Sequence, residues 1–349
     1  MNDASPPPND RPGTETATVG TTATLRTRLR AALPLIVKIT RWVLILAVIA
    51  FAVWYFARMW EPVTAAVSAM NPWWVAGSFG ILLIGLVANA LSWTTILNGL
   101  GHPLPVARGA QIMLVGQLGK YVPGSVWAYV LQMELGRQHG VARARVLVTS
   151  LYAAGIGVVS SLILGAFALP QIAAGHPALL WLFVLLPLGL VCLHPAVMTA
   201  LANLALKLFR REPLEHRVGF GTIAKAVGYS LGSYVLYGVH IWLLTDGTVA
   251  FTEIVLMSAA LSLGFTAGLF AFILPSGVGV REAVLIGLLS VVIPVAEASA
   301  ISLVSRGMFT AGDLITAGAA AIVAAVMRRR LHRADVLGSE YADVASEPV

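Results

Sequence analysis

Two short stretches of the chain place a basic residue beside proline and glycine within otherwise apolar sequence. Residues 119–127 contain Lys120, and residues 274–282 contain Arg281. A lysine or arginine in such a place can bind an oxyanion, and arginine can do so with two parallel hydrogen bonds. Proline and glycine interrupt a helix, and the next helix then begins with free N–H groups and a partial positive charge. This pattern predicts a site for an anionic group such as phosphate.

The candidate binding residues are those that offer charge, a hydroxyl group, or backbone N–H groups at the two interruptions. They are Lys120, Tyr121, Pro123, Gly124 and Ser125 in the first stretch, and Pro275, Gly277, Gly279, Arg281 and Glu282 in the second. A structural interpretation stays open for both stretches. Lys120 and Tyr121 would then be interfacial residues, the lysine extending its charge to the membrane surface. Arg281 and Glu282 would form an ion pair that closes a hairpin.

Three further charged residues, Glu134, Arg306 and Asp313, are candidates for coupling to an ion or proton. Glu134 and Arg137 lie three residues apart on one helical face, and an ordinary surface pair is the preferred interpretation of them. Arg306 and Asp313 lie seven residues apart in the last apolar stretch, again on one face. Charges at membrane depth are costly and usually face a cavity or a partner. The alternative to coupling is a structural pairing of Arg306 with Asp313 or Glu297.

Other reactive residues offer little chemistry. His240 can serve as a proton relay or as a hydrogen-bonded packing residue. No H-x-x-x-H pair and no G-x-x-x-x-G-K-[ST] loop is present, which argues against a metal site and against ATP as the energy source. The single cysteine, Cys192, excludes a disulfide framework. We therefore expect no cofactor, no metal and no enzymatic activity.

The composition identifies the solvent of these residues as lipid. Of 349 residues, 58% are hydrophobic and only 11% are charged, whereas a soluble domain is about 25% charged. The mean hydropathy is +0.83. These values exclude a soluble enzyme, a nucleic-acid-binding domain and a secreted disulfide scaffold. The net charge of +7 comes largely from basic clusters beside apolar runs, as expected for a membrane protein facing anionic headgroups.

The apolar runs predict an all-α, polytopic membrane protein. We expect six full spans and two re-entrant hairpins interrupted by proline and glycine, the hairpins at 108–136 and 254–293. The spans are predicted at 42–59, 73–97, 146–169, 178–193, 222–244 and 299–327. Because 254–273 alone is long enough to span, a protein of eight full spans remains an alternative. Residues 194–211 form either a helix lying on the cytoplasmic surface or an extension of the preceding span.

The distribution of lysine and arginine gives the expected orientation and domain limits. Residues 1–41 are predicted to be a disordered, basic, cytoplasmic tail, 42–327 the membrane domain, and 328–349 a cytoplasmic C-terminal tail. The protein is then a multi-pass protein of the cell membrane. The two hairpins enter from opposite faces in this topology, like an inverted repeat, and paired interrupted segments indicate the substrate site of a transporter. We expect their tips to share one polar pocket.

The two interruptions also resemble the signatures of a known family. The block G-K-Y-x-P-G-x-x-W at 119–127 and the block L-P-x-G-x-G-x-R-E-A at 274–283 are similar to those of the lysylphosphatidylglycerol synthase transmembrane-region, or flippase-like, family. The resemblance covers about residues 40–330. It implies a polytopic protein that moves lipids or lipid-linked sugars between leaflets. Aminoacyl transfer is not implied, because the tails are too short to hold the soluble domain that performs it.

The resulting functional hypothesis is translocation, without ATP, of an anionic phospholipid or a polyprenyl-phosphate-linked lipid. One alternative is a non-transporting scaffold or accessory subunit for a lipid-dependent membrane glycosyltransferase. Another is a small-solute or ion-coupled transporter. The expected partners are membrane lipids and, in the scaffold hypothesis, a glycosyltransferase; no nucleic acid is expected, and the sequence does not fix an oligomeric state.

Overall fold

The structure is a computed structural model, and all statements below concern the residues that it describes. These are 68, 70–101, 103–121, 126–170, 184–208, 218–271 and 277–345, with side chains described up to 327. They all belong to the second of two compact units, Tyr55–Val349. The predicted tail 1–41 and the predicted span 42–59 therefore lie outside the described residues, as do Pro123, Gly124, Ser125 and Pro275.

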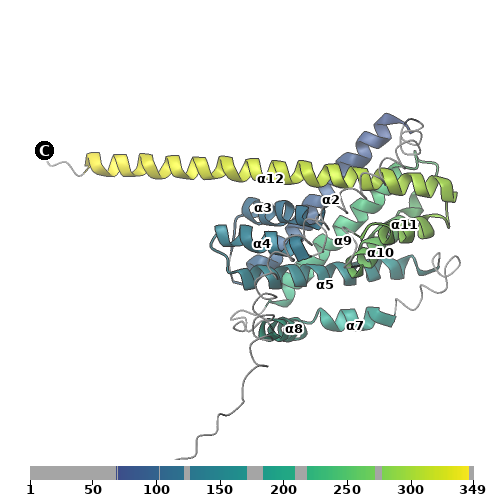
Figure 1. Cartoon of the computed structure of the whole chain (residues 1–349), viewed down its shortest axis with the longest axis horizontal. Helices are drawn as coiled ribbons and strands as arrows, with labels where there is room; N and C mark the ends of the chain where they lie inside the picture. Colours follow the sequence, from purple (N-terminus) through teal and green to yellow (C-terminus); the bar gives the residue numbers. More distant parts are fainter. Residues whose placement is uncertain are drawn as a thin grey trace, which may run out of the picture. The chain divides into compact units, whose positions relative to one another are not determined.

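All elements in the described ranges are helices (Figure 1). Four stretches are long and apolar enough to cross a membrane: α2 (Pro72–Gly99), α5 (Arg143–Phe167), Phe251–Phe270 around α10, and the first part of α12, Val295–Met327. They agree with the predicted spans 73–97, 146–169 and 299–327, and with the alternative that 254–273 spans by itself. The protein is thus an all-helical, multi-pass membrane protein. The predicted total of six spans and two re-entrant hairpins is not shown.

Helix α9 (Phe220–Leu243) lies where the span 222–244 was predicted, and it packs along α2. It is not one of the four apolar stretches, because serines, tyrosines and His240 lower its hydropathy. The two helices approach closely at Gly85, where an added Cβ would lie 2.4 Å from Cε1 of Tyr237. Ser92 Oγ also donates a hydrogen bond of 2.8 Å to the carbonyl of Ala226. Close packing and this hydrogen bond therefore join α9 to α2.

The first interrupted segment folds as a pair of short helices. Helix α3 (Val106–Gln117) leads into a 3₁₀ turn, η1 (Leu118–Tyr121), and α4 (Val126–Gln138) packs back against α3. Neither α3 nor α4 has the roughly 20 residues needed to cross the hydrocarbon core. Gly119 permits the close crossing, since an added Cβ would lie 2.6 Å from the backbone N of Ala128. The prediction of an interrupted segment at 108–136 is confirmed as a helical hairpin.

The second interrupted segment pairs a long helix with a short one. Helix α10 (Ile254–Phe270) is followed by α11 (Val280–Leu289), and the two pack together. Gly277 lies where the chain returns against α10, with a φ of +65°, and an added Cβ would lie 2.6 Å from Cα of Gly268. Helix α10 is buried nearly all round between Leu256 and Gly264, as expected for a central helix.

The described part of the predicted span 178–193 forms helix α7 (Leu185–Cys192), and the segment after it forms helix α8 (Pro195–Leu208). Their axes differ by 82° at the break before Pro195. Because proline cannot donate the backbone hydrogen bond that a continuing helix needs, the chain turns here. Residues 195–208 therefore do not continue α7 in a straight line, and the two short helices are long and apolar enough to cross a membrane only when taken together.

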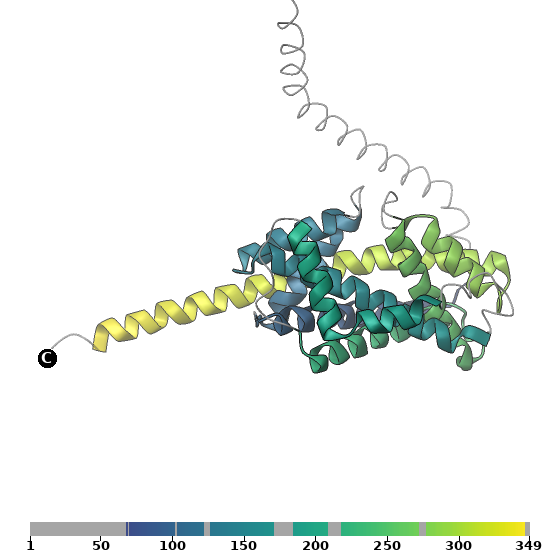
Figure 2. The same ribbon diagram turned by 90° about the horizontal axis from the view of Figure 1, so that it is seen from below.

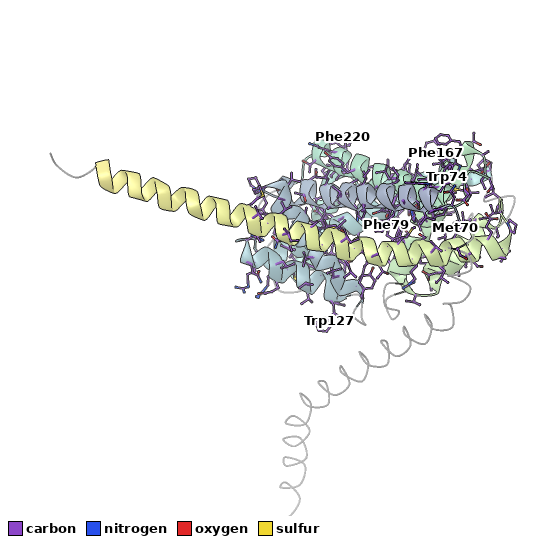
Figure 3. The ribbon with its side chains drawn as sticks, turned by 90° about the horizontal axis from the view of Figure 1, so that it is seen from above. Met70, Trp74, Phe79, Trp127, Phe167 and Phe220 are labelled. Carbon is purple, nitrogen blue, oxygen red and sulfur yellow. The ribbon has the colours of Figure 1, made fainter. Side chains whose placement is uncertain are left out.

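Helix α12 (Val295–Ala345) contacts both hairpins, through α3 and η1 of the first and α11 of the second (Figure 1, Figure 2). It continues beyond the predicted end at 327, so 328–345 are helical. Large apolar side chains such as Phe167 and Phe220, each more than 70% exposed, project away from the helices (Figure 3). Such an apolar exterior suits lipid, whereas soluble proteins rarely expose large apolar patches. The fold thus brings both interrupted segments to one helix.

Candidate binding site

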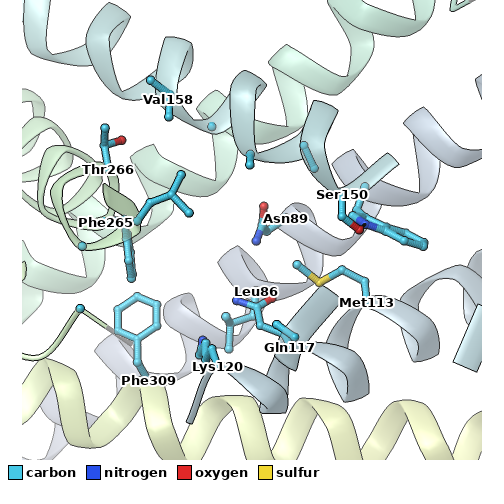
Figure 4. A pocket seen from close by; sticks show the side chains of 18 of the residues that line it. Leu86, Asn89, Met113, Gln117, Lys120, Ser150, Val158, Phe265, Thr266 and Phe309 are labelled. Atoms are coloured by element: carbon cyan, nitrogen blue, oxygen red, sulfur yellow. Dashed lines mark hydrogen bonds between the residues drawn. The ribbon is translucent and has the colours of Figure 1, made fainter. Parts of the chain in front are cut away.

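The two hairpins line one cavity, of about 290 Å³, together with α2, α5, α9 and α12 (Figure 4). The first hairpin contributes Lys120, and the second contributes Gly277 and Arg281. Figure 4 shows Phe265 and Phe309 on one side of this space, and Asn89, Gln117 and Ser150 toward the other. The structure therefore brings the two predicted basic residues to one chamber.

The basic residue of the first hairpin is already paired. Lys120 Nζ lies 2.7 Å from Oδ2 of Asp313 on α12, and the hydroxyl of Tyr121 donates to the same oxygen over 2.5 Å. The Asp313 side chain is 3% exposed, whereas that of Lys120 is 22% exposed. Lys120 and Tyr121, the two described candidates of this hairpin, thus hold a buried carboxylate of α12.

The acidic residue of the second hairpin is paired in the same way. Arg306 Nη1 of α12 lies 2.5 Å from Oε1 of Glu282, and the backbone N–H of Gly279 donates to Oε2 of Glu282 over 2.7 Å. The predicted pairing of Arg306 with Asp313 or Glu297 is wrong, and so is the alternative that Glu282 pairs with Arg281. The carboxylate of Glu282 also occupies the start of α11, where we had expected N–H groups free for an external anion.

Arg281 also lines the cavity, but it belongs to neither of the two ion pairs with α12. It is 5% exposed, and its Cζ lies 4.6 Å and 4.8 Å from the ring centroids of Phe265 and Phe309. The aromatic faces attract the guanidinium group. Its Nε and Nη2 are buried and have no hydrogen-bond partner among the described residues. These two nitrogens form one edge of the guanidinium fork, which can bind two oxygens of a carboxylate or phosphate.

Uncharged polar side chains also line the cavity, and no sequence motif identified them. On four helices, α2 to α5, they are Asn89 on α2, Gln117 on α3, Tyr129 and Gln132 on α4, and Ser150 on α5. The indole of Trp93 donates to Ser150 Oγ over 3.1 Å, and that hydroxyl donates to Oε1 of Gln132 over 2.6 Å. The available signal was the presence of amide side chains in membrane segments, since polar residues there usually face a cavity.

Glu134 is not among the residues that line the cavity. It accepts hydrogen bonds from Arg137 over 2.6 Å and from Arg143 over 2.7 Å, at an exposed position of α4. The hydrogen bond from Arg137 has the largest effect and that from Arg143 the next largest, and they lower the pKa of Glu134 to about 2. The geometry agrees with the surface-pair interpretation, now extended to a second arginine.

His240 takes the packing role that was one of its two interpretations. Its Nδ1 lies 2.6 Å from Ser78 Oγ and its Nε2 lies 3.0 Å from Ser305 Oγ, so the buried ring joins α9 to α2 and α12.

The same helix contains the letters of a catalytic motif. Residues 228–232 read G-x-S-x-G, the letters of a hydrolase nucleophile turn, but they lie inside α9 with Ser230 buried. That chemistry requires a turn between a strand and a helix.

Comparison with known sequences places this arrangement in a family. No curated protein matches the chain. The sequence model of the family described as "Lysylphosphatidylglycerol synthase TM region" matches residues 42–317, which is most of the chain and includes both hairpins, all lining residues of the cavity, and Asp313. The chain therefore belongs to the family of lysylphosphatidylglycerol synthase transmembrane regions.

Proposed function

We propose that this protein moves an anionic lipid between the two leaflets of the cell membrane without using ATP. Its family is associated by name with the synthesis of a charged phospholipid, which supports a role involving membrane lipids. In this proposal the protein is a transporter and not an enzyme, and both termini lie in the cytoplasm, as the charge distribution predicts.

The observation that carries the proposal is that Arg281, which lines the cavity, has two buried nitrogens without a hydrogen-bond partner among the described residues. A buried cation without a polar partner is unfavourable, because its lost hydration is not replaced. An oxyanion that enters the cavity would supply two hydrogen bonds and a charge partner at once. The site is therefore organised to bind an anion and is incomplete without one.

The charges around the cavity match a phosphate that carries one negative charge. Lys120 is balanced by Asp313, and Arg306 is balanced by Glu282, so Arg281 contributes the net charge among the described residues around the cavity. A phosphodiester, the linkage of most phospholipid headgroups, carries a single negative charge. The balance of the site thus favours a phosphodiester over a more highly charged solute.

The transport step follows from the cost of a bare charge in hydrocarbon. An ionised group in a medium of low dielectric constant is destabilised by a free energy on the order of tens of kcal/mol. Arg281 and the polar lining would replace water around the headgroup during the crossing, while the hydrocarbon chains stay in lipid. Exposure of the cavity first to one face and then to the other completes the movement.

Vesicles containing the purified protein test this proposal. The probe is phosphatidylglycerol with a fluorescent acyl chain in a phosphatidylcholine vesicle, and a membrane-impermeant reductant quenches the outer leaflet. We expect the protein to speed movement of this probe without ATP, and Arg281→Gln to remove about 90% or more of that rate, since it deletes a charge-assisted pair of hydrogen bonds. Arg137→Gln, at an exposed position on α4, is the matched control and should keep the wild-type rate.

Each alternative function predicts a different result in this experiment. A scaffold for a glycosyltransferase moves no lipid by itself, so a wild-type rate equal to that of protein-free vesicles contradicts the proposal. A solute transporter takes up a soluble anion and leaves the lipid in place. Equal rates for wild type and Arg281→Gln would exclude Arg281 as the headgroup-binding residue.

A further inference from the structure

Helix α8 is too short to cross a membrane by itself, and it runs across the bundle. Its 14 residues are fewer than the roughly 20 that a span needs. Its axis differs by 82° from that of α7, and both views show it crossing the direction of α5 (Figure 1, Figure 2). Because α5 is long and apolar enough to span, a helix that crosses α5 lies closer to the membrane plane than to the membrane normal.

One face of α8 is buried against the end of the bundle at which α5 and α9 begin. Met198, Ala202 and Leu206 follow each other at intervals of four residues, and none is more than 5% exposed. They share a core cluster with Val148 of α5 and Ile223 of α9. Val148 lies five residues after the start of α5, which is about 8 Å along its axis. The helix therefore lies at the depth where a span approaches the membrane surface.

The opposite face of α8 exposes leucine next to lysine. Leu201 and Leu204 are 50% and 65% exposed, and Lys207 is exposed as well. At 3.6 residues per turn, Leu204 lies between the other two around the helix, about 60° from each. Lys207 is also the only charged residue of this helix. A change from apolar to basic across the exposed face is typical of a helix that lies at a membrane surface.

The surroundings of this face favour anionic lipid over protein as its partner. Phe220, the first residue of α9, is 74% exposed at the same end of the bundle, so an apolar exterior continues there. Lys225 of α9 is exposed too, and residues 209–217 contain three arginines against two glutamates. Apolar contact area combined with an excess of positive charge complements a leaflet that contains anionic lipids.

We infer that α8 lies in the headgroup region of one leaflet and binds anionic lipid there. Leu201 then faces the hydrocarbon, Lys207 faces the phosphate groups, and Leu204 lies between them. The alternative is that α7 and α8 together form one broken span, which their length and composition allow. Of the described residues that line the cavity, none belongs to α8, so this inference does not depend on the proposed transport.

Spin labels on single cysteines measure the orientation of α8. The background variant is Cys192→Ala, which removes the single cysteine of the sequence. Labels are attached to Ala200→Cys, Leu201→Cys and Lys207→Cys, all at exposed positions, in vesicles of phosphatidylglycerol and phosphatidylcholine. Collisions of each label with oxygen and with a water-soluble nickel chelate report its depth. We expect equal depth at 200 and 207, which lie on one helical face, and greater depth at 201.

Each alternative predicts a different pattern of depths. If α8 is the second half of a span, positions 200 and 207 differ in depth by about 10 Å, and the neighbours 200 and 201 are nearly equal. That pattern overturns the inference. Poor access of both reagents at all three positions also overturns it, because a partner protein or a second copy of the chain would then cover this face.

A fluorophore at Leu204→Cys, in the same background, tests the preference for anionic lipid. Quenching by brominated phosphatidylglycerol is compared with quenching by brominated phosphatidylcholine, and the two give the local enrichment of the anionic lipid. We expect an enrichment of about fivefold, the effect of one basic residue near an anionic surface. Lys207→Gln should remove most of this enrichment.

The matched control is a fluorophore at Leu314→Cys, which is 58% exposed within the apolar part of α12. It should show no enrichment, because the hydrocarbon chains of the two lipids are alike. Equal quenching by both lipids at Leu204→Cys, or an enrichment that Lys207→Gln leaves unchanged, overturns the assignment of anionic lipid to this face.

Discussion

The two interrupted segments resemble each other in sequence but hold their charges differently. In the first, the cation Lys120 is bound to Asp313, and its neighbour Tyr121 binds the same carboxylate. In the second, the acid Glu282 is bound to Arg306, and its neighbour Arg281 is left with two unpartnered nitrogens. Both partners come from α12, which thus supplies an acid to one hairpin and a base to the other.

This difference assigns different roles to two residues that the sequence presents as equivalent. Lys120 and Arg281 were both predicted to hold the anion. Lys120 already has a carboxylate within hydrogen-bond distance, so it primarily fastens the first hairpin to α12. Arg281 has aromatic rings on its faces and nothing polar on one edge. The second hairpin therefore provides the charge of the site, and the first provides most of its amide lining.

The strongest test of this contrast is removal of the basic member of each ion pair between a hairpin and α12. Arg306→Met leaves Glu282 charged and buried, and the loss of one member of a buried pair costs about 3–5 kcal/mol. Lys120→Met should lower the free energy of unfolding by only about 1–2 kcal/mol, because Lys120 is partly exposed and Asp313 keeps the hydrogen bond from Tyr121. Denaturation in mixed detergent micelles measures both values.

The double variant Glu282→Gln, Arg306→Met provides the control for that comparison. It removes both charges, so it should be more stable than Arg306→Met alone. Equal destabilisation by Lys120→Met and Arg306→Met would contradict the distinction between the two hairpins.

A smaller effect is expected from the glycine that lets the second hairpin close. Gly277→Ala forces a side chain into a positive φ and places its Cβ 2.6 Å from Cα of Gly268, so we expect a loss of about 2–4 kcal/mol in unfolding free energy. Gly279→Ala also has a positive φ but meets no atom within 4 Å, so a smaller loss of about 1–3 kcal/mol is expected from the backbone conformation. The difference in thermal unfolding temperature measures the contact alone. Equal losses would show that backbone conformation, and not the close approach to α10, makes Gly277 necessary.

The sequence predicted the interruptions better than it predicted their partners. Proline and glycine act on the backbone near them, so the hairpins around Gly119 and Gly277 could be read locally. The pairing of Arg306 with Glu282 could not be predicted from the local sequence. Asp313 shares its helical face, but seven residues correspond to about 10 Å along a helix axis, too far for a hydrogen bond. Each charge instead meets a residue from a different hairpin, which only the tertiary structure determines.

The amide lining was missed for a related reason. Asn89, Gln117 and Gln132 belong to three helices and form no motif along the chain. They converge only because α3 packs on both α2 and α4. Individually each is a single polar residue in an apolar stretch, whereas Lys120 and Arg281 stand out beside proline and glycine. Sequence patterns therefore identified the charged residues of the cavity and not its uncharged amide lining.

The smallest effect is expected from the exposed ion pairs of Glu134, which contrast with the buried ion pairs of α12. Hydrogen bonds from Arg137 and then Arg143 lower the pKa of Glu134 from its ordinary 4.5 to about 2 in the folded protein. The folded state therefore binds fewer protons than the unfolded state between these values. The stabilisation is complete above about pH 4.5 and is lost as the pH falls through about 2.

Replacement of Glu134 by Gln should remove this part of the pH dependence and leave stability above pH 4.5 only slightly reduced. Because Glu134 and both arginines that bind it have exposed side chains, added salt should shrink the difference between wild type and variant. The buried pair of Arg306 and Glu282 should respond far less to salt, since solvent ions do not reach it. Thermal unfolding in detergent between pH 5 and about pH 2.5, at low and high salt, measures both effects. An identical pH profile for wild type and Glu134→Gln would mean that the pKa of Glu134 is not lowered by folding.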